Sequence, residues 1–264
     1  RNACLESDEV HAIYIFSSKQ NNLHNEANCK VEFVIENLKR LDQELSKINI
    51  PLTIFDSVGF NDNSDIILNL VKERSLDKVF WNNQFGEDER KRDELVLRSL
   101  DENRVRYSSY DEKVVYQPGS IRTGEDKPYS VFTPFKKKWI ENFNLDLLDI
   151  EFKYLPKKKT STESNLEKFD FKFKRKHLVD MSIWPPGESH ARDRLRLYLD
   201  KNIFRYSQDR NDPIIDATSR ISPYLANGVI SPKRCILEAL KINNFELDSG
   251  EKGITKWIDE IIWR

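Results

Sequence analysis

The first part of the chain alternates between short apolar runs, typical of β-strands, and longer segments with the period of a helix. The apolar runs cover residues 10–16, 51–56, 78–81 and 114–116. The segments between them place apolar residues three and four positions apart, along residues 31–48, 66–71 and 95–100. Each of these helices therefore has one apolar face that can pack on a sheet. The alternation predicts an α/β architecture with a parallel sheet, of the Rossmann-like type.

The pattern changes in the second part of the chain. Residues 145–180 are rich in Lys, Ser, Thr, Glu and Asn, which predicts a long polar connector. After Pro185 and Pro186 the periodicity is helical, over residues 188–210, 232–242 and from 253 onward. We therefore predict three regions, which are an α/β domain at residues 1–117, a connector at 118–185 and the beginning of an all-helical domain at 186–264.

Composition narrows the classes of protein. The 264 residues are 38% hydrophobic, which is enough for packed cores. With 43 basic and 44 acidic residues, any contact with nucleic acid needs a local basic patch. Cys4, Cys29 and Cys235 lie far apart, which argues against a zinc site and against a disulfide framework. No apolar run approaches the roughly 20 residues of a membrane span, so we expect a cytoplasmic protein without a metal.

The most specific segment covers residues 218–232 and reads T-S-R-I-S-P-Y-L-A-N-G-V-I-S-P. Thr218, Ser219 and Ser222 offer hydroxyl groups beside the start of a helix, and Arg220 adds a cation. Such a combination can bind an anion, for example a pyrophosphate. Ser followed by Pro is also an ordinary helix start, so a pair of capped helices explains the same residues. The spacing alone leaves both interpretations open.

The last segment reads W-I-D-E-I-I-W-R. On a helix, one face would carry Trp257, Glu260, Ile261 and Arg264, with Trp263 on its flank. A carboxylate between two indoles is unusual and indicates chemistry, although an amphipathic core helix has the same periodicity. The sequence begins at Arg1 rather than Met and stops inside this pattern, so we expect a fragment.

The segment at residues 218–232 resembles the flavin-binding signature T-S-R-x-S-P-x-L-x-x-G-x-[IL]-S-P of the DNA photolyase and cryptochrome family. Further segments are similar to family motifs and follow in the family's order, at residues 82–93, 115–135, 206–213 and 257–264. This resemblance covers nearly the whole chain. It implies an antenna-binding α/β domain that lacks its first strand, followed by the N-terminal part of a helical FAD-binding domain.

The resemblance also implies roles for individual residues. It assigns FAD binding to Tyr206, Thr218, Ser219, Arg220, Ile221, Ser222, Trp257, Glu260 and Arg264. It assigns contact with damaged DNA to Arg210, Glu260 and Trp263, and catalysis to the last two. Glu260 would bond the damaged base pair and Trp263 would stack on it, which suits a flipped-out apolar lesion with polar edges. Arg210 would contact the DNA backbone.

In family members with a folate antenna, a histidine and an acidic pair hold 5,10-methenyltetrahydrofolate. His24, Asp88 and Glu89 align with these positions. A carboxylate suits a pterin because its two oxygens accept two parallel N–H bonds. Asp88 stands where some members have Asn, which keeps an acceptor and loses a donor. Without the resemblance, an exposed imidazole and two surface charges explain these residues as well.

The implied activity is that of a class I cyclobutane pyrimidine dimer photolyase, a carbon–carbon lyase that acts as a monomer on damaged DNA. Reduced FAD would donate an electron to the dimer, the ring would split, and the electron would return. A cryptochrome would share the fold and the flavin, but Glu260 with Trp263 favours repair. A nucleotide-binding α/β protein without photochemistry would explain residues 10–117 and leave the helical half unexplained.

Overall fold

The computed structural model describes residues 1–59, 62–148, 154–172 and 180–264. Parts of the predicted connector, residues 149–153 and 173–179, lie outside the described residues. The described residues form two compact units. The first unit contains those of Arg1–Tyr110 and Phe152–Gly187, and the second those of Asp111–Glu151 and Glu188–Arg264. Each unit is therefore built from two separate stretches of sequence.

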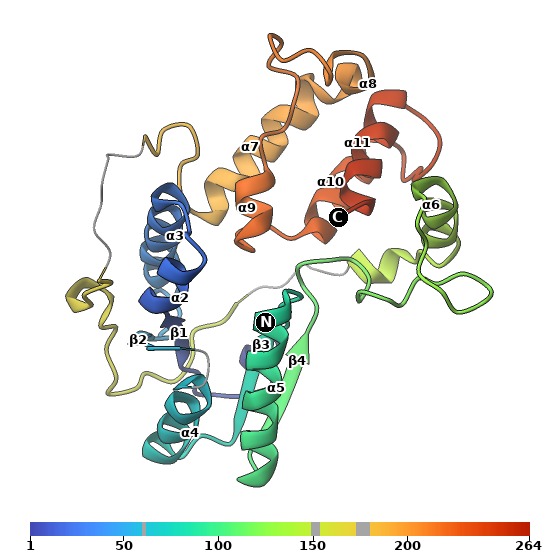
Figure 1. Ribbon diagram of the computed structural model, residues 1–264. Helices are drawn as coiled ribbons and strands as arrows, with labels where there is room; N and C mark the ends of the chain where they lie inside the picture. Colours follow the sequence, from blue (N-terminus) through green and yellow to red (C-terminus); the bar gives the residue numbers. More distant parts are fainter. Residues whose placement is uncertain (60–61, 149–153, 173–179) are drawn as a thin grey trace. The chain divides into compact units, whose positions relative to one another are not determined.

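The first unit is α/β. Its strands are β1 (Ala12–Phe16), β2 (Leu52–Asp56), β3 (Lys78–Asn82) and β4 (Arg106–Tyr110). Its helices are α1 (Asn2–Glu6), α2 (Ser18–Leu23), α3 (Asn28–Ser46), α4 (Asp62–Arg74), α5 (Glu87–Glu102) and the 3-10 turn η2 (Leu166–Lys168). Strand β1 pairs in parallel with β2, and β3 with β4 (Figure 1). The predicted α/β class with parallel strands is confirmed, although the described strands form two separate pairs.

The prediction of a strand at residues 114–116 was wrong. The fourth strand is β4, eight positions earlier, and Val105 and Tyr107 at its start pack against the core of α4 and α5. The strand reads R-Y-S-S-Y, so it contains no apolar run, and the adjacent Ser108 and Ser109 interrupt the alternation that would indicate a strand. Residues 114–116 instead line an apolar cavity in the second unit. A run of three apolar residues is too short for periodicity to distinguish a strand from a buried loop.

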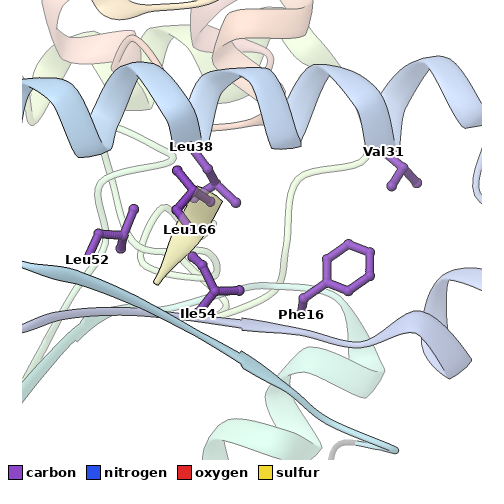
Figure 2. Packing of buried hydrophobic residues seen from close by; sticks show 6 residues of the cluster. All are labelled: Phe16, Val31, Leu38, Leu52, Ile54 and Leu166. Carbon is purple, nitrogen blue, oxygen red and sulfur yellow. The ribbon is translucent and has the colours of Figure 1, made fainter. Parts of the chain in front are cut away.

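Helix α3 covers the pair β1 and β2. Its Val31 lies above Phe16 of β1, and its Leu38 lies in the same cluster as Leu52 and Ile54 of β2 (Figure 2). Leu166 of η2 completes this cluster. The preceding Asn165 accepts from the Ile54 amide at 2.7 Å and donates to the Ile54 carbonyl at 2.9 Å, as a neighbouring strand would. The segment around Leu166, predicted from its composition as connector, is therefore docked on β2.

The second unit is helical. Its helices are α6 (Phe132–Glu141), α7 (Glu188–Lys201), α8 (Tyr206–Asp209), α9 (Ser222–Ala226), α10 (Pro232–Ile242) and α11 (Lys252–Ile262), with 3-10 turns η1 (Leu145–Leu148) and η3 (Ile203–Arg205). Helices α7, α10 and α11 confirm the predicted helical pattern. Helix α6, which lies in the predicted connector, was not anticipated. No helix in the described part of the chain has the length and apolar character needed to cross a bilayer.

Candidate functional site

An ion pair joins the two charged residues expected to contact damaged DNA, Arg210 at the backbone and Glu260 at the lesion. Glu260 on α11 binds Arg210, the residue that ends α8. The pair is partly open to solvent, with the Arg210 side chain 26% exposed and that of Glu260 44% exposed. The guanidinium carbon of Arg210 also lies 5.6 Å from the ring centre of the buried Tyr206. The structure thus brings together three of the predicted site residues.

The charges of this cluster act on each other. The hydrogen bond to Glu260 raises the pKa of Arg210 above its usual value, against the opposing effect of burial. Burial raises the pKa of Tyr206, the charge of Glu260 raises it further, and the hydrogen bond to Arg210 acts in the opposite direction. Tyr206 therefore stays a neutral phenol, and Arg210 a cation beside a carboxylate.

Trp263 lies at the end of α11 and is 55% exposed. Two rings of α6 contact it edge-on. The ring centre of Phe132 lies 4.9 Å from that of Trp263, with the planes at 80°, and that of Phe135 lies 6.0 Å away at 73°. Both are edge-to-face arrangements that aromatic pairs favour. The indole is thus in contact with two rings of α6 while more than half of its surface remains exposed.

The prediction of one shared face for the last segment was wrong. Helix α11 ends at Ile262, so Arg264 lies beyond it. Trp257 and Ile261 are buried, whereas Glu260 is exposed. The buried face of α11 is wider than the proposed stripe, because apolar residues at 254, 257, 258, 261 and 262 all pack inward. Arg264 lines a cavity of about 140 Å³ together with Tyr116, Phe135 and Trp139.

Trp257 anchors α11 against the segment with the flavin-type signature. Its indole Nε1 donates to Ser219 Oγ at 3.4 Å. Its ring lies 5.7 Å from that of Tyr198 on α7, which in turn contacts Tyr206 edge-on at 6.4 Å. Burial strongly raises the pKa of Tyr198. Its buried hydroxyl has no hydrogen-bond partner among the described residues.

The segment at residues 218–222 is a tight passage between α8 and α9. Arg220 adopts a left-handed conformation with φ of 50° and pairs with Asp216 at 2.9 Å. Ile221 is buried and fixes the passage, while Thr218 and Ser222 are exposed. The alternative interpretation, two helices capped by serine, is confirmed for α10, where the Ser231 hydroxyl accepts from the Arg234 amide at 3.1 Å. It was wrong for α9, whose N-cap is Ile221 without a side-chain hydrogen bond.

The residues predicted for an antenna meet in the first unit. His24 ends α2, and its Nε2 lies 3.5 Å from Asp88 Oδ2 in the first turn of α5. The same nitrogen lies 2.7 Å from the Gln20 amide nitrogen. It accepts from Gln20 when it carries no proton and donates to Asp88 when it carries one, so it cannot make both hydrogen bonds at once. Both side chains of the His24–Asp88 pair are nearly half exposed.

Glu89 stands beside this pair. A Cβ added at Gly86, the N-cap of α5, would collide with the Glu89 carboxylate. The carboxylate therefore folds back over the helix start, where the helix dipole favours negative charge. His24 and Asp88 thus form a small polar pair built from two helix ends, and Glu89 follows Asp88 in the first turn of α5.

Sequence reasoning missed several residues of the second unit. Phe132, Phe135 and Lys136 lie on one face of α6, and Tyr198 lies behind Trp257. The spacing of three and four residues in F-T-P-F-K was the available signal. The resemblance of residues 115–135 to an interdomain passage favours a connector there instead.

Residues 1–157 match the model of the DNA photolyase family. The chain belongs to this family. It is 30% identical over 263 residues to the deoxyribodipyrimidine photo-lyase of Vibrio cholerae, a match that covers 97% of this chain and 54% of that protein. The corresponding protein of Escherichia coli is 30% identical over 266 residues, covering 99% and 54%. The chain spans about half the length of the curated relatives it matches.

Solved structures agree on the fold of this family. The class III photolyase from Agrobacterium tumefaciens superposes with a TM-score of 0.81 at 23% identity, over 100% of this chain and 53% of that one. A cryptochrome from Synechocystis superposes with a TM-score of 0.74 at 17% identity, over 97% and 54%. A photolyase and a cryptochrome therefore share this architecture.

Proposed function

We propose that the full protein is a deoxyribodipyrimidine photo-lyase that repairs cyclobutane pyrimidine dimers in DNA, driven by light and reduced FAD. The observation that carries this proposal is that the last turn of α11 carries Glu260, which pairs with Arg210 at the end of α8, together with an exposed Trp263. A flipped-out dimer needs a π surface and a hydrogen-bonding group, and this helix end offers both. Its relatives from Vibrio cholerae and Escherichia coli carry this name.

The residues of the second unit fit FAD by the chemistry of their donors. Thr218 and Ser222 expose hydroxyl groups, and Arg220 is a cation 45% open to solvent, which suits a pyrophosphate. Tyr206 and Trp257 contribute aromatic surface beside the buried, unbonded hydroxyl of Tyr198. When bound and reduced, FAD supplies the electron that splits the dimer.

The chain's own residues bind and orient the substrate. Arg210 donates to a backbone phosphate, which adds affinity without sequence preference. Glu260 accepts hydrogen bonds from the polar edge of the lesion, and Trp263 supports its apolar face. Tyr206, packed under Arg210, limits the rotation of the guanidinium.

The same proposal includes a class I type of protein with a folate antenna. His24, Asp88 and Glu89 would hold 5,10-methenyltetrahydrofolate, with the carboxylates accepting bonds from the pterin. The 3.5 Å contact between His24 and Asp88 supports this because residues 64 positions apart in the numbering come together in one polar cluster.

Repair can be tested directly on the full protein. Purified protein with reduced flavin is mixed with an oligonucleotide that contains one dimer and is exposed to blue or near-ultraviolet light. We expect loss of dimers in the light and none in the dark. A protein that binds flavin yet leaves the dimers intact would contradict repair and favour a cryptochrome-type photoreceptor, whose fold is also similar.

A further inference from the structure

Lys136 on α6 is a largely buried cation between two acidic residues. Its side chain is 19% exposed, and its Nζ lies 2.7 Å from Asp259 Oδ1 on α11. It also contacts Asp248 in the loop between α10 and α11. Asp259 Oδ1 is buried and has no hydrogen bond of normal geometry, so the ammonium compensates it as an ion pair. Burial opposes the charge on Lys136, but the two aspartates outweigh it and raise its pKa.

The loop that carries Asp248 is itself fixed. Asn243 is buried, and its amide nitrogen donates to the Ser249 carbonyl at 2.8 Å. Its amide oxygen accepts from the Glu251 amide at 3.0 Å. Asp248 therefore approaches Lys136 from an ordered loop, and Asp259 approaches from a rigid helix.

The charged contact and the aromatic contact lie one helical turn apart on both helices. On α6, Lys136 follows Phe132 by four residues and Phe135 by one. On α11, Trp263 follows Asp259 by four residues, and its amide bonds the Asp259 carbonyl at 3.0 Å. Residues four apart stack on one helix face. Any shift of α6 that separates Lys136 from Asp259 would also move both phenylalanine rings against Trp263.

The cost of breaking the ion pair between Lys136 and Asp259 favours one fixed position of α6 on α11. A buried ion pair adds little net stability, but removing Lys136 would leave Asp259, whose side chain is 11% exposed, with only the longer 3.6 Å contact to Lys256 among the described residues. Exposed aromatic contacts alone would let Trp263 turn, since more than half of its surface is free. The buried pair holds α6 in one register on α11, and the rings of α6 then determine the orientation of the indole.

We propose that Lys136 is a positioning residue for lesion recognition, which clamps α6 to α11 through Asp259 and thereby holds Trp263 in the orientation that stacks on a damaged base pair. This inference rests on the proposed function for the role of Trp263. The clamp itself, from Lys136 through Phe132 to Trp263, rests on the geometry of the second unit alone.

The test compares variants of the full protein with bound flavin, in the dark. Lys136→Met removes the clamp, Lys136→Arg keeps the charge, and the exposed neighbour Lys137→Met removes a charge of the same helix without touching Asp259. Binding is measured to an oligonucleotide with one dimer and to its undamaged counterpart. Near-ultraviolet circular dichroism reports whether the Trp263 indole has one fixed orientation. The Trp263 signal is the difference between the spectra of each protein with and without Trp263→Phe.

We expect Lys136→Met to lower the preference for damaged DNA about five- to tenfold and to remove the Trp263 signal. Lys136→Arg should stay within about twofold of the original preference, and Lys137→Met should affect both DNAs equally. Should Lys136→Met prevent folding, Lys136→Met with Asp259→Asn removes both charges and gives the same readouts. A Lys136→Met protein that loses thermal stability but keeps its preference and its Trp263 signal would overturn the proposal. Absence of any preference in the unaltered protein contradicts the proposed function, while the dichroism still decides whether the clamp exists.

Discussion

Arg210 and Glu260, fifty positions apart in the sequence, pair with each other at the surface of the second unit. Each is proposed to bind a different part of damaged DNA, Arg210 a phosphate and Glu260 the lesion. In the protein without DNA they satisfy each other. Under this proposal, DNA binding replaces the ion pair by one new contact for each residue. Before binding, the ion pair keeps both side chains oriented towards each other.

Replacing Glu260 with Ala should lower the rate of dimer repair by roughly ten- to a hundredfold, since a hydrogen bond to a charged group is worth about 1.5–3 kcal/mol. Flavin content should change much less. The ion pair with Arg210 is partly solvent-exposed, so its loss should change the free energy of unfolding by no more than about 1 kcal/mol. Repair per bound flavin is the measurement. Equal losses of repair and of flavin would show that Glu260 serves the cofactor and not the lesion.

Replacing Arg210 with Met should weaken binding to damaged and undamaged DNA alike, because a phosphate contact carries no sequence information. The slope of log affinity against log salt concentration should fall by about 1. Arg205 provides a matched control, since it lies five residues earlier, pairs with Asp209 at 3.0 Å and is 70% exposed. An unchanged salt slope in Arg210→Met, or the same change in Arg205→Met, would remove Arg210 from the DNA interface.

The class of fold could be predicted from the sequence because strand and helix alternate clearly in the first unit. Helices α3, α10 and α11 follow apolar stripes at helical spacing, and packing of those stripes decides the structure. The sequence did not reveal β4, because Arg106 and the adjacent Ser108 and Ser109 leave neither an apolar run nor a regular alternation. It also did not reveal that Leu166 docks on β2, since a single Asn165 side chain provides the contact to the strand.

The candidate site was predictable to a smaller extent. Motif resemblance pointed to Arg210, Glu260 and Trp263, but not to the ion pair between Arg210 and Glu260 or to the rings of α6 that contact Trp263. Such partners depend on tertiary packing, which a local pattern does not contain. The helical wheel grouped Trp257 with Glu260, whereas packing buried the first and left the second at the surface. Periodicity reports spacing, and the neighbouring helices determine which positions are covered.

Replacing Ser219 with Ala should lower the free energy of unfolding by about 1 kcal/mol. The change removes the acceptor of the Trp257 indole N–H, and Trp257 is buried, so water cannot replace the bond. Ser222→Ala is the control, because Ser222 is exposed and should change stability by less than about 0.5 kcal/mol. Urea titration of both variants gives the two values. Equal stabilities would mean that the 3.4 Å contact contributes nothing.

Stability should fall above pH 9 through Cys235. This thiol is buried, and burial raises its pKa from 9.0 to about 12. Between these values the unfolded chain has lost the proton and the folded chain keeps it. Stability from this group is therefore complete below pH 9 and decreases by up to about 1.4 kcal/mol per pH unit above it. The difference in unfolding free energy between the unaltered protein and Cys235→Ala, measured from pH 8 to 10, should show this slope. A pH-independent difference would contradict it.

The antenna assignment predicts that Glu89→Ala removes the near-ultraviolet absorption of a bound folate and leaves the flavin bands and flavin-driven repair unchanged, since the flavin residues belong to the other unit. Glu87→Ala is the control, because Glu87 lies on the same helix, is 75% exposed and pairs with Lys91. Gly86→Ala is a sharper variant. Its φ of −64° accepts alanine, yet the new methyl group would displace the Glu89 carboxylate while every acidic group remains. We therefore expect Gly86→Ala to weaken folate binding as Glu89→Ala does, and full folate absorption in both variants would exclude Glu89 from the antenna site.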